Sequence, residues 1–141
     1  MKKFDEFNLD KEILKSLNIL NYNTPTEVQD KVIPKLIDKN NILVKSKTGT
    51  GKSASFAIPI CNQIKSLEKD LKALVIVPTR ELALQVKEEI ENIGRIKRIK
   101  CSAILGKDSF SNQVLELKQG VNVIVATPGR MIDHITKGSV D

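Results

Sequence analysis

The stretch Ile42–Ser53 limits the possible folds of this chain more than any other feature of its sequence. A short apolar run ends there, Gly49 and Gly51 follow, and Lys52-Ser53 begins a helical pattern. A strand, a glycine-containing loop and a helix in this order typically form a triphosphate-binding loop. An ordinary glycine turn is the alternative. The stretch also departs from the general eight-residue pattern, because Ser46 stands where the first glycine is usual.

Each part of the predicted loop has a chemical role. The glycines let the backbone curl so that successive N–H groups point at phosphate oxygens. The helix that follows adds its positive N-terminal end. Lys52 can reach the β- and γ-phosphates, and the Ser53 hydroxyl can occupy one Mg²⁺ position. The predicted phosphate-binding residues are Ser46, Lys47, Thr48, Gly49, Thr50, Gly51, Lys52 and Ser53, with Lys52 and Ser53 also assigned to catalysis.

Composition narrows the class of protein. A chain of 141 residues with 40% hydrophobic and 28% charged residues is typical of one globular domain. Its apolar runs are too short to span a bilayer, and the N-terminus lacks a signal peptide's apolar core. Cys61 and Cys101 predict no disulfide framework or metal site, and His134 is the single histidine. We therefore expect a cytoplasmic protein with no membrane partner.

The rest of the sequence alternates between strand and helix patterns. A helix should follow Asp10 as its N-cap, and a second should begin with a Thr24/Glu27 capping box and Pro25 at its first position. The run Leu74–Val77 shows no alternation, which predicts a strand buried on both faces. Expected strands are 42–46, 74–77, 101–105 and 122–126; expected later helices are 52–64, 79–93, 109–119 and 129–137. This order predicts an α/β fold with a parallel sheet flanked by helices.

Two of the predicted strands end in similar polar sequences. Pro78-Thr79-Arg80 follows one strand, and Thr127-Pro128-Gly129-Arg130 follows another. Ligands of such sheets gather at the carboxyl ends of the strands, and hydroxyls, guanidinium groups and helix N-termini hold phosphodiester oxygens. The pattern favours contact with a nucleic-acid backbone, and a net charge of +6 suits such a partner. For the basic segment Arg95–Lys100, an RNA contact and a solvated loop or edge strand both remain open.

At these residues the chain resembles the N-terminal RecA-like half of a DEAD-box RNA helicase. The segment 47–53 resembles motif I of that family, in which position 46 is usually Ala. Residues 78–83 resemble motif Ia, residues 127–130 resemble motif Ib, and Gly106 with Gln113 resembles the intervening glycine motif, although Lys107 replaces its second glycine. Residues 21–29 resemble the Q motif, with Asn21 in place of the usual glycine.

The resemblance implies roles for further residues. Thr24 and Gln29 would contact the adenine of ATP, and Phe4 would stack on it; from spacing alone, Gln29 could also be a surface residue and Phe4 a core residue. The RNA-binding residues would be Pro78, Thr79, Arg80, Gly106, Thr127, Pro128, Gly129 and Arg130. The chain 1–141 would be the N-terminal part of the first RecA-like domain, incomplete at its C-terminus, with 1–38 as the Q-motif region.

The resemblance also implies parts that this sequence lacks. No predicted strand ends in the Asp-Glu-Ala-Asp motif, and the second RecA-like domain would lie beyond Asp141. We therefore expect the parent protein to be an ATP-dependent RNA helicase, and the chain alone to hydrolyse no ATP and unwind no RNA. The segment 86–100 resembles a bacterial subfamily that remodels large-subunit ribosomal RNA. The alternatives are a P-loop nucleotide or small-molecule kinase and a non-catalytic RNA-binding module.

Overall fold

A computed structural model describes residues 3–45 and 51–140 of the chain, so the predicted loop residues Ser46–Thr50 lie outside the described residues. The described elements alternate in the expected order after an N-terminal helical region. They are a 3-10 helix η1 (Phe4–Glu6), α1 (Lys11–Ile19), α2 (Glu27–Ile37), α3 (Lys52–Gln63), β1 (Ala73–Ile76), α4 (Arg80–Ile93), β2 (Cys101–Ile104), α5 (Phe110–Gln119), β3 (Val123–Ala126) and α6 (Pro128–Thr136).

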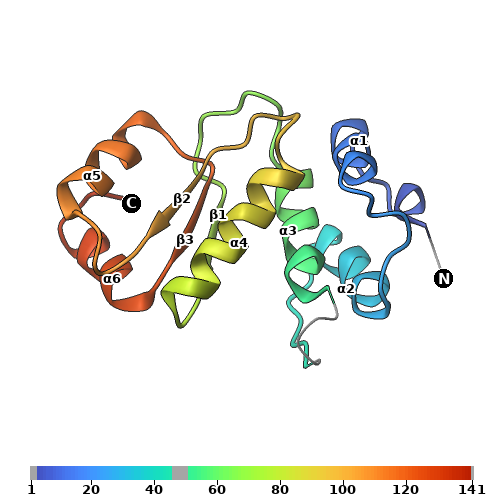
Figure 1. Cartoon of the computed structure of the whole chain (residues 1–141), viewed down its shortest axis with the longest axis horizontal. Helices are drawn as coiled ribbons and strands as arrows, with labels where there is room; N and C mark the ends of the chain where they lie inside the picture. The colour runs from blue at the N-terminus through green and yellow to red at the C-terminus, as the bar shows by residue number, and fades with distance from the viewer. Residues whose placement is uncertain (1–2, 46–50, 141) are drawn as a thin grey trace.

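The three strands form one parallel sheet in the order β1-β3-β2. Ile76 and Ile104 both pair with Ala126, so the carboxyl ends of the strands are level with one another. α5 and α6 cover one face of the sheet, and α4 and α3 lie on the other with α1 and α2 beyond them (Figure 1). This arrangement confirms the predicted α/β fold with a parallel sheet flanked by helices.

Alternating residues of β3 contribute to two separate cores. Val123 and Val125 pack into the large cluster formed with α1, α3 and α4. Ile124 and Ala126 point to the opposite face, where they pack with Ile104, Val121 and Met131. Since β3 is the middle strand, all four of its residues are buried. It therefore has the two-sided burial that is typical of a central parallel strand.

The prediction that β1 is buried on both faces was wrong. Its residues alternate, and Leu74 and Ile76 are 48% and 50% exposed. Their partners in register are Ile124 and Ala126, which α6 and its neighbours cover. Because β1 lies at the edge of the described sheet, its outer residues extend past that cover and remain in contact with solvent.

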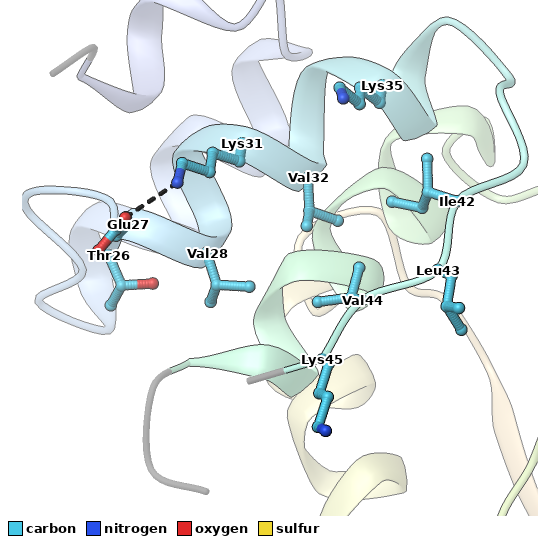
Figure 2. Close-up of a pocket in the computed structure, with 10 residues that line it drawn as sticks. All are labelled: Thr26, Glu27, Val28, Lys31, Val32, Lys35, Ile42, Leu43, Val44 and Lys45. Carbon is cyan, nitrogen blue, oxygen red and sulfur yellow. Dashed lines mark hydrogen bonds and ion pairs between the residues drawn. The ribbon is translucent and has the colours of Figure 1, made fainter. Parts of the chain in front are cut away.

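The prediction of a strand at 42–46 was also wrong for the residues that the structure describes, 42–45. Residues 42–45 belong to no strand of the described structure, and Leu43 is fully exposed. This segment runs beside α2 (Figure 2) and is not part of the three-stranded sheet. A strand needs a neighbouring ladder to satisfy its backbone N–H and C=O groups, and none is present at this position among the described residues.

The second helix begins later than predicted. Thr26, rather than Thr24, is the N-cap of α2, and it forms a capping box with Gln29. The Gln29 N–H donates to Thr26 Oγ1 at 3.3 Å, and the Thr26 N–H donates to Gln29 Oε1 at 3.0 Å. Pro25 therefore precedes the cap, and the Thr24/Glu27 box was wrong because a Gln at the third helical position closes the box as well as Glu does.

Candidate functional site

A large cleft lies between the N-terminal region, the start of α3 and the β1–α4 connection. Its volume is about 1050 Å³. It brings together six of the residues that the sequence assigned to nucleotide binding, which are far apart in the chain. These residues are Phe4, Thr24, Gln29, Gly51, Lys52 and Ser53. The other predicted nucleotide-binding residues, Ser46–Thr50, lie outside the described residues.

Gly51 and Gln29 fix the position of the α3 N-terminus against α2. Gly51 is the N-cap of α3 and has a φ of +83°, which favours glycine. Gln29 is only 6% exposed, and its Nε2 donates to the Gly51 carbonyl oxygen at 3.2 Å. A Cβ atom on Gly51 would lie 2.5 Å from Gln29 Nε2. Any other residue at position 51 would therefore strain the backbone and displace the Gln29 amide.

Lys52 and Ser53 are the first two residues of α3 and are both half-buried at the cleft. A twelve-residue helix directs its unpaired N–H groups and its positive end toward this position. The donor set therefore fits a polyphosphate. The described residues contain no group of three or more His, Cys, Asp or Glu that could hold a metal ion. A Mg²⁺ ion here would depend on the Ser53 hydroxyl together with phosphate oxygens and water.

The aromatic part of the cleft contains Phe4 and Tyr22. Phe4 is buried and packs edge to face against Phe7, with ring centroids 6.1 Å apart. The Tyr22 hydroxyl donates to Glu89 Oε1 at 2.8 Å. Burial, followed by the hydrogen bond to Glu89 and its charge, raises the pKa of Tyr22 to about 12. No sequence pattern indicates the contact between Tyr22 and Glu89, because 67 positions separate them in the chain.

The predicted RNA-binding residues lie at the carboxyl ends of the three strands. Thr79 caps α4 by accepting a hydrogen bond from the Leu82 N–H at 3.2 Å. Arg80 is the first residue of α4, and its Nη1 lies 2.9 Å from Asp108 Oδ1 in the turn after β2. Thr127 is the N-cap of α6, and its backbone N–H donates to the Ile104 carbonyl oxygen. The other predicted RNA-binding residues that are exposed at this edge are Pro78, Gly106, Pro128 and Gly129.

Arg130 makes its contacts within the protein. Its side chain is 15% exposed. Its Nη1 donates to the Asp108 carbonyl oxygen at 2.8 Å and to Gln113 Oε1 at 3.0 Å, and its Nη2 donates to the Gly106 carbonyl oxygen at 2.5 Å. The guanidinium thus joins α6 to the turn after β2. In this arrangement Arg130 holds the edge together and directs none of these N–H groups outward.

The network continues into a buried pair that sequence reasoning missed. Gln113 Nε2 donates to the Leu105 carbonyl oxygen, so its Oε1 is the acceptor for both Arg130 and His134 Nε2, the latter at 2.7 Å. His134 is fully buried and stacks on Phe110 at 4.1 Å, while its Nδ1 has no hydrogen-bond partner. Burial, followed by the positive charge of Arg130, lowers the pKa of His134. Arg130 and His134 are four residues apart on α6, and this spacing could have indicated that the two side chains lie on the same face of the helix.

A second groove lies between α2 and residues 42–45 (Figure 2). Its volume is about 590 Å³, and its apolar part comes from α2 and residues 42–45, with Val32 and Val44 facing one another across it. Lys31, Lys35 and Lys45 lie around it, and Lys31 pairs with Glu27 at 2.9 Å. None of the predicted catalytic residues lines this groove, so we place the functional site in the larger cleft.

The fold and the cleft define a class of parallel α/β protein in which a polar strand end and a helix N-terminus line one cleft. Comparison with known proteins gives the family: the DEAD/DEAH box helicase profile matches residues 26–141, and the chain belongs to this family. The ATP-dependent RNA helicase DbpA of Bacillus subtilis is 49% identical over 140 residues, which cover 99% of this chain and 29% of that protein.

Solved structures agree with this assignment. A DEAD box protein from the hyperthermophile Methanococcus jannaschii has a TM-score of 0.92 and 38% identity, covering 99% of this chain and 38% of that one. Saccharomyces cerevisiae Dbp5, bound to RNA and ADP BeF3, has a TM-score of 0.88 and 27% identity, covering 100% of this chain and 36% of that one. This chain therefore spans about a third of the length of these relatives.

Within the described residues, no helix combines the length and the apolar character that crossing a membrane requires. Cys61 and Cys101 are both buried and free. Burial is the largest cause that raises the pKa of each thiol to about 12. Both thiols therefore stay protonated and pack as small apolar groups.

Proposed function

We propose that this chain is the ATP- and RNA-binding part of an ATP-dependent RNA helicase. One observation carries the proposal: a single cleft joins Phe4 and Gln29 to Lys52 and Ser53, although they are spread over the first 53 residues. The family assignment supports ATP as the ligand. The RNA-bound yeast relative supports RNA as the partner. The kinase and non-catalytic alternatives have no comparable support.

Each end of the cleft would bind a different part of the nucleotide. The α3 N-terminus, the Lys52 ammonium group and the Ser53 hydroxyl would hold the phosphates and a Mg²⁺ ion. Phe4, Thr24 and Gln29 would surround the base. In this structure both groups of the Gln29 amide are already bonded, to Thr26 and Gly51. Each group has capacity for one more hydrogen bond, so Gln29 could also contact the base while it holds Thr26 and Gly51, which would couple adenine binding to the position of the α3 N-terminus.

The strand ends would bind the RNA backbone. Pro78, Thr79 and Arg80 would contact phosphates at the α4 N-terminus, and Gly106, Thr127, Pro128, Gly129 and Arg130 would shape the continuation of this edge. Bound ATP supplies the phosphoryl group whose transfer to water drives the motor. We propose that residues 1–141 form the N-terminal part of the first RecA-like domain, with 1–38 as the Q-motif region. The second RecA-like domain would complete the machinery.

The RNA target is a finer proposal. We infer a structured, ribosomal substrate in the cytoplasm, acted on by a bacterial subfamily that remodels large-subunit RNA. The segment 86–100 supports this subfamily, and yeast relatives 37–39% identical to this chain are named ATP-dependent rRNA helicases. Competition between fragments of large-subunit RNA and unrelated RNA of equal length tests it. Equal affinity for both would contradict the subfamily assignment.

ATP binding tests the main proposal by calorimetry. Lys52→Ala should weaken ATP binding about tenfold or more, because it removes a charge-assisted contact with phosphate. Lys45→Ala is the matched control, since Lys45 lies outside the cleft on residues 42–45. We expect no RNA-stimulated ATP turnover from the 141-residue chain. Equal ATP affinity of the Lys52 and Lys45 variants would contradict the assigned site.

A further inference from the structure

We propose that Asp108 sets the affinity of this edge for RNA by competing with phosphate for Arg80. In the RNA-free chain the Asp108 carboxylate contacts the guanidinium that RNA would use, and a phosphate must displace it. The inference rests on the proposed RNA-binding function and adds to it Asp108, a residue outside the motifs that predicted this edge. Asp108 acts here as an affinity-setting residue, separate from the nucleotide cleft.

The geometry of the pair matches that of a phosphate contact. Arg80 Nη1 and Asp108 Oδ1 are 2.9 Å apart, within the range of a charge-assisted hydrogen bond. The guanidinium belongs to the first residue of α4 and the carboxylate to the turn after β2. An anionic oxygen thus already contacts the Arg80 guanidinium, the group to which a phosphate oxygen would bind.

The turn that carries Asp108 is held in place. Its backbone N–H donates to the Leu105 carbonyl oxygen at 3.3 Å, and its carbonyl oxygen accepts from Arg130 Nη1 at 2.8 Å. Arg130 also binds the Gly106 carbonyl oxygen, so the poorly exposed guanidinium of α6 anchors both ends of the turn. The Asp108 carboxylate is therefore presented to Arg80 from a fixed backbone.

The sheet order places this pair across the predicted RNA path. β1 and β2 are separated by β3, so an ion pair between the α4 start and the turn after β2 extends past the end of β3. Thr127 and Pro128 follow β3 at the same edge. An RNA backbone that follows the three strand ends must pass the Arg80–Asp108 pair.

The pair is weak enough to open. The side chains of Arg80 and Asp108 are 49% and 41% exposed, and exposed ion pairs of this kind shift equilibria by about two- to fivefold. A phosphate can accept two parallel hydrogen bonds from the guanidinium, which favours the exchange. Removing the carboxylate leaves Arg80 and the exposed Lys107 as cations at this edge. It also removes the repulsion between Asp108 and RNA phosphates.

Fluorescence anisotropy with a short single-stranded RNA tests the inference in the 141-residue chain. Asp108→Asn, an isosteric change at a half-exposed position, should tighten RNA binding by about two- to fivefold, and Asp108→Ser should do the same. Asp70→Asn is the matched control. It removes one negative charge from an exposed residue before β1, at the opposite edge of the sheet, and should leave the affinity unchanged.

A double-mutant cycle separates competition from a general charge effect. Arg80→Ala should weaken RNA binding, and Asp108→Asn should give a smaller gain in that background, because only its repulsion of RNA phosphates is left to remove. If Arg80→Ala weakens binding but Asp108→Asn changes nothing, competition by Asp108 is overturned while the RNA-binding proposal stands. An equal gain with and without Arg80 also overturns it. If the chain binds no RNA, or Arg80→Ala has no effect, the proposed RNA edge itself fails.

Discussion

His134 has a side chain whose titration should be visible in the stability of the whole fold. It is fully buried, and burial together with the charge of Arg130 lowers its pKa from an ordinary value of 6.5. Because Gln113 Oε1 can only accept, the hydrogen bond between them requires a proton on His134 Nε2. The neutral ring then leaves Nδ1 as the buried atom without a partner. Protonation of Nδ1 would place a charge there.

The sign of the pH effect follows from this shift. The unfolded chain binds a proton near pH 6.5 and the folded chain binds it only at lower pH, so the free energy of unfolding should fall as pH decreases below about 6.5. His134→Phe should remove this component while keeping the stack on Phe110. Urea unfolding at several pH values measures the difference, which isolates His134 from the carboxylates that titrate in both proteins.

NMR gives an independent check, since His134 is the only histidine in the sequence. Its ring signals need no assignment among other histidines, and their titration in the folded chain should have a midpoint below 6.5. A midpoint at or above that value would contradict both the lowered pKa and the expected pH dependence.

Several residues that line the large cleft could be picked out from the sequence because they belong to local patterns. The glycine-containing stretch before a helical pattern indicated Gly51, Lys52 and Ser53, which do line this cleft; their binding of a nucleotide stays a prediction. The same patterns missed the Tyr22–Glu89 and Arg80–Asp108 pairs. Each pair joins elements that only the folded chain brings together.

At the scale of elements, patterns of hydrophobicity located most helices and strands but not their surroundings. The start of α2 was misplaced because two Thr residues, at 24 and 26, both had an acid or amide three residues later. The prediction that β1 is buried on both faces was wrong because a continuous apolar run does not reveal where the covering helices end. The segment 42–45 shows the same limit, since the sequence cannot supply the neighbour that makes an apolar run a strand.

The basic segment Arg95–Lys100 was interpreted either as an RNA contact or as a solvated loop or edge strand. Neither interpretation describes Lys97. Its ammonium group is buried at the end of α3, where it pairs with Asp10 at 2.7 Å and donates to three carbonyl oxygens. Those acceptors are the backbone oxygens of Cys61, Asn62 and Ile64. A cation at a helix C-terminus satisfies unpaired carbonyl groups and the negative end of the helix. Lys97 thus joins α1, α3 and the segment after α4.

Replacing Lys97 should therefore cost stability rather than RNA affinity. Lys97→Met keeps the length of the side chain but leaves buried carbonyl oxygens and Asp10 without their partner, which should lower the free energy of unfolding by about 3 kcal/mol. Lys100→Met is the matched control, because it removes the same charge from an exposed neighbour. Urea unfolding distinguishes them. Equal losses in both variants would show that the charge of the segment, and not the Lys97 contacts, stabilises the fold.

At the scale of the whole molecule, the described sheet has one face that is incompletely covered. Leu74 and Ile76 are half-exposed on the edge strand β1, and Leu43 is fully exposed on the segment beside α2. An exposed strand edge with apolar side chains favours pairing between copies of a chain. The exposed residues on β1 therefore predict self-association of the chain at this strand.

A single charge on β1 should reduce self-association of the 141-residue chain. In Leu74→Lys the ammonium group would extend from the uncovered face into solvent, while any copy paired at this edge would have to bury it. Leu115→Lys is the matched control, since Leu115 is 58% exposed but lies on α5, away from a strand edge. Light scattering over a range of protein concentrations should show a lower average mass for Leu74→Lys alone. A monomeric mass for the unmodified chain at every concentration would contradict the prediction, because it would show that the exposed β1 residues cause no self-association.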